Sequence, residues 1–406
     1  MTAPSLSTLD EDLLADRGDE APALWAGVAS LALGVFGLVT AEFLPASLLT
    51  PISQDLGVSL GAAGQTMTVT AVVAAFAGPG IVIGTARQDR RLVLFGLTAA
   101  LILSSALAAT ADGLVQLLLA RALLGIGLGG FWAMSLALAM RLVPGRLMPR
   151  AMAIVMSGVS AATVCAAPIG AYVGDVLGWR AAFVISGVLG LAALLLQILT
   201  LPAMPPKGSA SLSTMAAVLR RPAIRLGLLT VLLVVSGHFA GFTFVRPFLE
   251  SGPQMSVAGI SATLLAFGIG GFIGNLAGGF LAERNTPRAI IFAASGIAAM
   301  AFILAFAGAH AGLVAAVTAL WGFFFGALPV SVQSFVTKAA GDEAESAGAM
   351  MLTTFQIAIS SGAIFGGLIV ETQGPAGVFA FTGIAALLGA TAITLGSRRP
   401  MALSEG

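Results

Sequence analysis

The chain has 406 residues, of which 58% are hydrophobic and 9% are charged, and its formal net charge is +1. Soluble globular proteins carry roughly 25% charged residues, so this composition excludes a chain that covers its surface with polar groups in water. The small net charge also argues against a nucleic-acid partner. Repeated apolar runs of about 20 residues predict instead an all-α membrane protein.

A polar segment, residues 1–23, precedes the first apolar run. Its acidic residues are Asp10, Glu11, Asp12, Asp16, Asp19 and Glu20. Because a secretory signal peptide begins with positive charge, we interpret this segment as a polar cytoplasmic tail. The only cysteine, Cys165, lies in an apolar run, so an intramolecular disulfide is excluded.

Twelve apolar runs follow, six on each side of the polar segment 202–223. They lie at 24–49, 62–84, 92–111, 114–140, 151–173, 181–201, 224–249, 259–281, 289–309, 312–336, 346–370 and 377–396. Helices that are apolar nearly all round are typical of membrane spans. The sequence therefore predicts twelve transmembrane helices.

Basic residues are distributed unevenly between alternate loops. If the N-terminus is cytoplasmic, the inside segments contain 16 of the 19 Lys and Arg residues, and the outside loops contain only Arg180. The other two, Arg121 and Arg246, lie within predicted spans. This partition follows the positive-inside rule. It predicts a multi-pass protein of a bacterial-type inner membrane with both termini cytoplasmic.

The two halves of the chain resemble each other. Pro45 near the outer end of the first span has a counterpart in Pro247 of the seventh, and glycine followed by charged residues ends the second and eighth spans. Since each half starts on the same side, the repeats are parallel and related by an axis along the membrane normal. We expect six-helix bundles at 24–201 and 224–396, a cytoplasmic linker at 202–223 and a cytoplasmic tail at 397–406.

Glu42 is an acid placed well within the first predicted span, and Arg121 lies at a similar depth in the fourth. Ionisable groups inside a bilayer are costly, which makes them candidates for function. Burial disfavours a charged carboxylate, whereas a neighbouring arginine favours it. A movement that changes the distance between these residues would therefore load and release a proton. The alternative is a static ion pair that holds the two spans together.

Arg246 and His238 are the other ionisable residues within spans, both in the seventh. Arg246 keeps its proton, so it would bind substrate or pair with an acid such as Glu42. Alternatively, it extends from the end of its span toward the interface. His238 can titrate near neutral pH and would serve as a proton relay, or it is a packing residue.

Aromatic and amide side chains suggest a binding cavity. Phe242 and Trp321 belong to a group of aromatic residues that could stack on a planar ring, although such residues also face lipid or fill the core. Gln333 and Gln356, in the tenth and eleventh spans, could supply hydrogen bonds to a sugar or a base. We predict that these four residues contact substrate together with Arg246.

Several stretches are similar to motifs of one transporter family. A glycine-rich stretch follows Arg121 in the fourth span, and Pro168 and Gly170 lie near the end of the fifth. The loop from Gly279 follows the eighth span, whereas in the equivalent loop after the second span Gln88 stands where an acid is usual. With twelve spans in a six-plus-six repeat, these stretches resemble the major facilitator superfamily.

The closest resemblance is to the drug–proton antiporter group, especially bacterial sugar-efflux and purine-ribonucleoside-efflux permeases. It is carried by the stretches 40–45, 237–240, 242–250 and 321–329. It implies two pseudo-symmetric six-helix bundles in the major facilitator fold. For eight residues that match the family motifs it implies gating or conformational roles: Gly84, Asp89, Arg90, Pro168, Gly170, Gly279, Glu283 and Arg284.

The resemblance implies a secondary active transporter that exports a small organic molecule in exchange for protons, working as a monomer. An importer or uniporter of a small polar solute is the alternative within this class. A membrane-embedded sensor or enzyme is the alternative outside it. Two histidines and one cysteine offer few metal ligands, and no phosphate-binding or metalloprotease motif is found. We therefore expect no cofactor, no metal and no enzymatic activity.

Overall fold

The structure is a computed structural model that describes residues 23–205, 219–306 and 310–398. Over these ranges the chain is helical and contains no strands. Twelve of the described helices are long and apolar enough to cross a membrane, as the sequence predicts. Residues 1–22, 206–218 and 399–406, which contain most of the predicted tails and linker, lie outside the described ranges.

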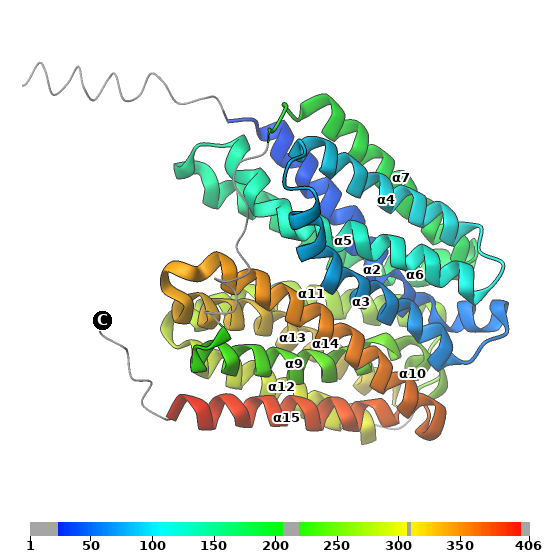
Figure 1. Ribbon diagram of the computed structural model, residues 1–406. Coiled ribbons are helices and arrows are strands. Elements are labelled where there is room, and N and C mark those ends of the chain that lie inside the picture. Colours follow the sequence, from blue (N-terminus) through cyan, green and yellow to red (C-terminus); the bar gives the residue numbers. More distant parts are fainter. Residues whose placement is uncertain (1–22, 206–218, 307–309, 399–406) are drawn as a thin grey trace, which may run out of the picture.

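The helices form two bundles, one from each half of the chain (Figure 1). The first bundle contains α2 (Trp25–Leu56), α3 (Leu60–Gly84), α4 (Arg90–Ala109), α5 (Leu114–Leu142), α6 (Met148–Val176) and α7 (Trp179–Thr200). The second contains α9 (Pro222–Thr243), α10 (Val245–Ser251), α11 (Val257–Arg284), α12 (Thr286–Phe306), α13 (Ala311–Ala340), α14 (Ala344–Gln373) and α15 (Gly377–Arg398). Two bundles of six membrane-crossing helices confirm the predicted fold class.

The first and seventh spans differ from their predicted forms. α2 continues past residue 49 through Pro51 and ends at Leu56, where Gly57 caps it with a positive φ of 62° that suits glycine. The seventh span is instead interrupted at Phe244, between α9 and α10. Pro247 explains the interruption, because it has no N–H for the carbonyl of Thr243, four residues earlier. Arg246 therefore lies on the short helix α10 and not on the main span.

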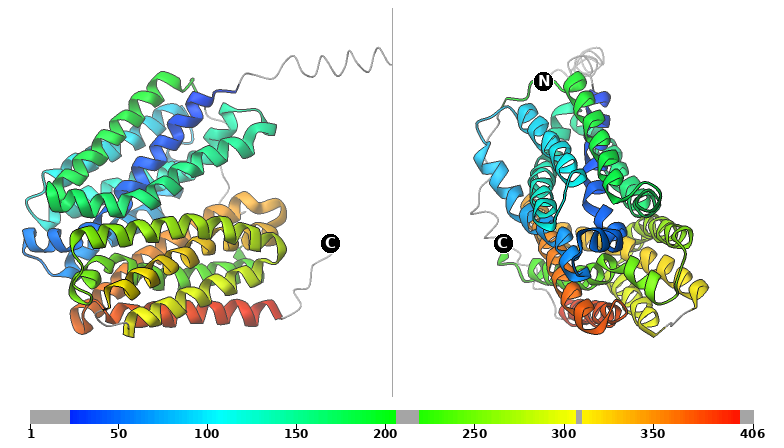
Figure 2. Two further views of the ribbon diagram at one scale, coloured as in Figure 1. Left: turned by 180° about the vertical axis from the view of Figure 1, so that it is seen from behind. Right: turned by 90° about the vertical axis from the view of Figure 1, so that its right-hand side faces the viewer.

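The two bundles diverge toward one end of the molecule. Figures 1 and 2 show that α2 and α9 begin and α15 ends at that end, which we call the termini end. The opposite end, called the far end, carries the loops at 57–59, 110–113 and 252–256. There the bundles approach each other, and the Gly61 amide of α3 donates to Oε1 of Glu371 on α14 at 2.8 Å. The far end is closed in this structure.

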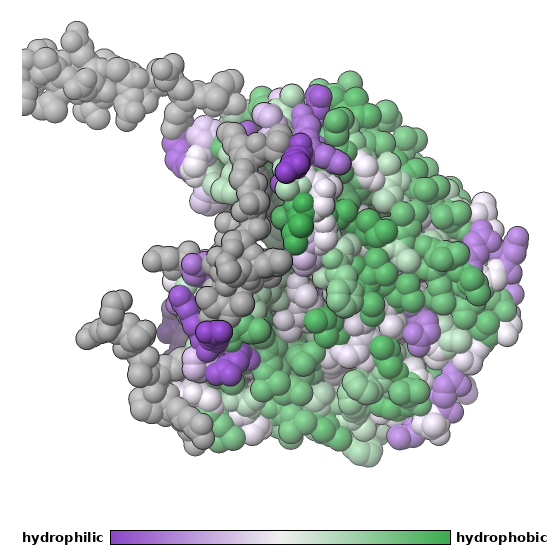
Figure 3. Space-filling view, viewed as in Figure 1, coloured by the Kyte–Doolittle hydropathy of each residue, from purple (hydrophilic) through white to green (hydrophobic). Residues whose placement is uncertain are grey.

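The outer surface matches a protein surrounded by lipid. Figure 3 shows a broad hydrophobic surface with hydrophilic residues gathered toward the two ends. Large apolar side chains such as Phe76 and Leu199 are 76% and 81% exposed. In water, exposed apolar surface of this extent would be an aggregation hazard, whereas in a bilayer it contacts acyl chains.

A close helix crossing joins the bundles between α6 and α11. A Cβ atom added at Gly268 of α11 would lie 2.6 Å from Cα and 2.9 Å from the carbonyl oxygen of Val164 on α6. Because both neighbours are backbone atoms, no rotamer change can make room for a side chain. Gly268 therefore allows the two helices to touch.

We predict that Gly268→Ala weakens the contact between the bundles and destabilises the protein by about 1–3 kcal/mol, the usual cost of overpacking. Thermal unfolding of the purified protein in detergent measures the effect. Gly271→Ala on the same helix is the matched control, because its Cβ would lie 3.5 Å from the nearest backbone oxygen. Equal unfolding temperatures for the two variants would contradict this account of the crossing.

Candidate functional site

Glu42 lies in the middle of the molecule at the interface between the bundles. The residue is 5% exposed on α2. Its Oε1 accepts a hydrogen bond of 3.4 Å from Nε2 of Gln356, which lies on α14 in the other bundle. The structure thus brings together a predicted proton-coupling residue and a predicted substrate-binding residue. A buried carboxyl group whose partner belongs to the opposite bundle is sensitive to the separation of the bundles.

Arg121 on α5 is 1% exposed, and its guanidinium donates to backbone carbonyls. Nη1 donates to Ala41 at 2.7 Å, Nη2 to Glu42 at 3.0 Å and Nε to Thr66 at 3.1 Å. Pro45 explains the first bond, because proline has no N–H for the carbonyl of Ala41, four residues earlier. A buried carbonyl without a partner costs about 1–3 kcal/mol. Arg121 thus replaces a hydrogen bond that the helix lacks.

Arg121 lies beside Glu42 but is hydrogen-bonded to backbone carbonyls, a detail that the predicted acid–arginine pair does not include. The two residues lie next to each other, but the hydrogen bonds of the guanidinium go to main-chain oxygens of α2 and α3. The carboxyl group of Glu42 is bonded by Gln356. Arg121 therefore joins α5 to α2 and α3 and places a positive charge beside Glu42.

A second proline of α2 has a similar partner. Pro51 leaves the carbonyl of Ser47 without a helical donor. Nη1 of Arg246 donates to this carbonyl at 2.6 Å, although Arg246 belongs to the other bundle. Its Nε donates to Oε1 of Glu250 at 2.7 Å. Thr50 on α2 donates to the other carboxylate oxygen of Glu250. This group lies toward the far end, and Glu42 lies deeper in the molecule.

His238 lies inside an aromatic cluster of the second bundle. It is 1% exposed, and its ring stacks on Phe325 with a centroid distance of 3.3 Å and an interplanar angle of 1°. Phe242 and Phe267 stack near it at 5.7 and 6.0 Å, and the Trp321 ring lies at 4.9 Å. The predicted residues Phe242 and Trp321 thus belong to one cluster with His238.

Phe43 connects this cluster to Glu42, its neighbour on α2. The Phe43 ring lies 5.9 Å from both Phe239 and Phe242 of α9. Planar side chains from both bundles therefore form a continuous group beside the buried carboxyl group. Among the described side chains, His238 Nδ1 and Trp321 Nε1 are buried without a hydrogen-bond partner. Unpaired buried polar atoms of this kind are suited to a polar ligand.

Gln333, like Arg246, is a predicted substrate-binding residue that lies apart from this group. It is exposed on α13, near the termini end, and its Nε2 donates to Thr337 one turn later at 3.4 Å. Its side-chain hydrogen bond is thus made within α13 and not with Glu42 or the aromatic cluster. That Gln333 contacts substrate stays a prediction.

Of the residues predicted to act in gating, Asp89 makes the most contacts. It caps α4 by accepting from the Arg91 amide at 2.8 Å, and it accepts from the Met204 amide at 3.0 Å. The side chain of Arg90 donates to Thr85 at 3.2 Å. Asp89 therefore binds the start of the predicted linker to the first bundle. Gly84, just before this loop, is exposed.

The remaining motif residues lie in two places. Pro168 and Gly170 are buried in α6, where a Cβ on Gly170 would meet Ser47 and Leu44 of α2. Gly279, Glu283 and Arg284 lie at the termini end of α11, where the Arg284 guanidinium lies 4.5 Å from the centre of the Phe280 ring. The first pair is placed for helix packing, and the other three residues lie at the termini end. The gating or conformational roles of all five stay predictions.

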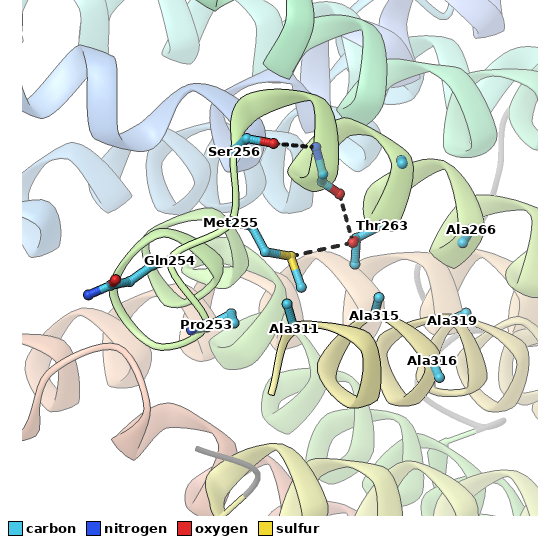
Figure 4. A pocket seen from close by; sticks show the side chains of 12 residues that line it. Pro253, Gln254, Met255, Ser256, Thr263, Ala266, Ala311, Ala315, Ala316 and Ala319 are labelled. Carbon is cyan, nitrogen blue, oxygen red and sulfur yellow. Dashed lines mark hydrogen bonds between the residues drawn. The ribbon is translucent and has the colours of Figure 1, made fainter. Parts of the chain in front are cut away.

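A pocket of about 640 Å³ lies elsewhere, between α11 and α13 near the far end. Figure 4 shows that its wall consists largely of alanines. The Thr263 hydroxyl donates to the sulfur of Met255 at 3.6 Å. It shares no lining residue with the group around Glu42. A wall with so few polar groups offers little to orient a polar solute.

Several residues that surround Glu42, Arg121 and Arg246 have no pattern in the sequence that assigns them to the candidate site. Phe43, Phe267 and Thr66 are ordinary members of apolar runs. Thr66 contributes only its carbonyl, which no side-chain pattern can reveal. Glu250 and Thr50 lie near the ends of predicted spans and resemble interfacial polar residues.

Comparison with known proteins identifies the family. The family model described as Major Facilitator Superfamily matches residues 31–363 and 254–404. The chain belongs to this superfamily. It is therefore a multi-pass membrane transporter, as the resemblance of its motifs implies.

Individual relatives support the same assignment. The purine ribonucleoside efflux pump NepI of Shigella sonnei (strain Ss046) is 38% identical over 370 residues, which cover 91% of this chain and 93% of that protein. NepI of Escherichia coli (strain K12) is 37% identical over the same share of each chain. A bacterial homologue of the human lysosomal transporter Spinster has the same fold, with a TM-score of 0.75, 18% identity and coverage of 92% of this chain and 96% of that one.

The role of Arg121 leads to a prediction about stability. We expect Arg121→Met to destabilise the protein by about 1–3 kcal/mol for each carbonyl that it leaves unpaired. Adding Pro45→Ala should recover part of this loss, because alanine supplies an N–H to the Ala41 carbonyl. Thermal unfolding of the two single variants and the double variant measures the coupling. Strictly additive effects would refute the proposed replacement of the missing hydrogen bond.

Proposed function

We propose that this transporter exports purine ribonucleosides from the cytoplasm in exchange for protons and leaves its cargo chemically unchanged. The observation that carries proton coupling is the burial of Glu42 between the two bundles, bonded to Gln356 across the interface. The cargo class rests on the 37–38% identity to purine ribonucleoside efflux pumps over 91% of the chain. The aromatic cluster beside Glu42 is consistent with a purine ring.

The orientation and the state of the structure follow from the charge partition. The loops that the structure describes at the termini end belong to the inside segments of the predicted charge partition, so we assign this end to the cytoplasm. The space-filling surface is hollowed between the bundles at this end (Figure 3), so we assign the conformation as open to the cytoplasm. A nucleoside would enter from this side. The protein would act as a monomer in the inner membrane.

The transport cycle requires Glu42 to exchange one proton. In the state open to the cytoplasm, Glu42 releases its proton and the nucleoside binds. After the bundles rock, the nucleoside leaves on the other side and a carboxylate oxygen of Glu42 takes up a proton. Arg121 stays beside Glu42 in both states, because α2, α3 and α5 move as one bundle. It supplies a fixed positive charge against which the carboxyl group titrates.

The aromatic cluster provides the contacts that we assign to the base. We assign stacking of a purine ring to Phe239 and Phe242, which border Phe43. Both are buried in this conformation, at 3% and 6% exposed, so neighbouring side chains would have to move aside for the base. The unpaired Nε1 of Trp321 is a donor, and the imidazole of His238 offers one further polar atom. In this assignment His238 contributes to recognition of the base, whereas Glu42 carries the proton.

We predict that Glu42→Gln abolishes accumulation of inosine driven by a pH gradient, because glutamine cannot bind and release a proton. Exchange of labelled for unlabelled inosine across proteoliposomes should persist, since it needs no net proton movement. Asp112→Asn, an exposed acid in a far-end loop, is the control and should transport as the parent does. Gradient-driven accumulation by Glu42→Gln would disprove the assignment.

Stacking can be tested separately from transport. We expect Phe242→Ala to lower the affinity for adenosine about tenfold, in line with the roughly 1–3 kcal/mol that aromatic–base stacking contributes. Phe76→Ala, which removes a ring that is 76% exposed to lipid, should leave affinity unchanged. Calorimetric titration in detergent compares the two variants. If adenosine does not bind the parent protein, the cargo assignment fails; if both variants bind as the parent does, the stacking assignment fails.

A further inference from the structure

The two prolines of α2 create two similar carbonyl groups with different partners. Pro45 frees the carbonyl of Ala41, and Pro51 frees that of Ser47. The first receives a hydrogen bond of 2.7 Å from Arg121, and the second one of 2.6 Å from Arg246. In both cases a buried guanidinium replaces the missing amide.

The two arginines differ in the bundle to which they belong. Arg121 lies on α5, in the same bundle as α2, so its bond survives when the bundles rock as rigid bodies. Arg246 lies on α10 in the second bundle, so its bond to Ser47 must break when the far end opens. The hydrogen bond from Thr50 to Glu250 also crosses the interface and must break in the same movement.

We propose that Arg246, Glu250, Thr50 and the Ser47 carbonyl form a latch that holds the far end closed and sets the equilibrium between the two conformations. The latch is separate from the proposed exchange of nucleosides for protons. Its action requires neither nucleoside binding nor proton binding. It requires only that the two bundles rock.

The contacts of Arg246 favour this role over direct binding of a solute. Its side chain is 6% exposed, and two of its donor nitrogens, Nη1 and Nε, are engaged by the Ser47 carbonyl and by Oε1 of Glu250. A solute would have to displace these bonds to use either nitrogen. Glu250 holds Arg246 in position and binds α2 through Thr50, so the acid contributes to both sides of the latch.

Pro51 gives the latch its acceptor. In a regular helix the Ser47 carbonyl would accept a hydrogen bond from the backbone amide of residue 51. A guanidinium that bonded to the same carbonyl would then contribute less stabilisation. Pro51 removes that competitor, and the acceptor can then be satisfied by the opposite bundle or by water. Opening of the far end therefore requires water to reach Ser47, because an unpaired carbonyl is unfavourable.

Distances between spin labels test this proposal without nucleoside or a pH gradient. Labels on Cys at Asp112 and Gly312, in a Cys165→Ala background, report the separation of the bundles at the far end. Both sites are exposed, and a Cβ on Gly312 has no atom within 4 Å. Double electron–electron resonance of the full-length protein in lipid nanodiscs gives the populations of the closed and open distances.

We expect Arg246→Ala to raise the population of the far-end-open state about tenfold or more, because it removes charge-assisted hydrogen bonds. Pro51→Ala and Glu250→Gln should raise it by smaller factors. Both leave the guanidinium in place and provide a measurement even if Arg246→Ala does not fold. Pro45→Ala is the matched control, since its carbonyl partner lies within one bundle, and it should leave the distances unchanged.

Two outcomes would overturn the proposal. Unchanged far-end distances in Pro51→Ala and Glu250→Gln would show that these contacts do not hold the end closed. An equal shift in Pro45→Ala would show that straightening of α2 is the cause and not loss of the latch. Because neither result involves transport, failure of the latch is distinguishable from failure of the proposed nucleoside export.

Discussion

The structure depends on the need to satisfy backbone hydrogen bonds inside a medium that cannot supply them. In a bilayer a carbonyl that loses its helical donor has no water to replace it. α2 contains two prolines and therefore two such carbonyls. Each is met by an arginine, and these two arginines are among the few charged residues inside the apolar runs. The positions of these two buried arginines thus match the positions of the two prolines of α2.

This constraint gives the two halves of α2 different behaviour. The segment around Ala41 is tied to α3 and α5 by Arg121 and belongs to a rigid bundle. The segment around Ser47 is tied to α10 across the interface. One helix therefore contributes both a fixed wall beside Glu42 and a movable contact at the closed end. Helix–helix packing through Gly268 adds an interface on which the bundles can turn.

The sequence predicts the architecture well because its signals are local. Twelve long apolar runs give the helices, and the exclusion of charge from lipid singles out Glu42 and Arg121. The contact of Glu42 with Gln356 joins residues 314 positions apart, and no local pattern encodes it. The exposure of Gln333 depends on the rotation of α13, which nearly uniform hydrophobicity does not reveal. The break at Phe244 follows from Pro247, but an apolar run conceals it.

The hydrogen bond between Gln356 and Glu42 has a consequence for energy transfer. Its two partners lie on different bundles, so in the proposed transport cycle the carboxyl group would have a different environment in each conformation. Any free energy by which conformation alters proton binding at such a group must equal the free energy by which proton binding alters conformation. In the proposed cycle, this side-chain contact of 3.4 Å would couple the position of a bundle to the protonation of the Glu42 carboxyl group, so that the two change in one equilibrium.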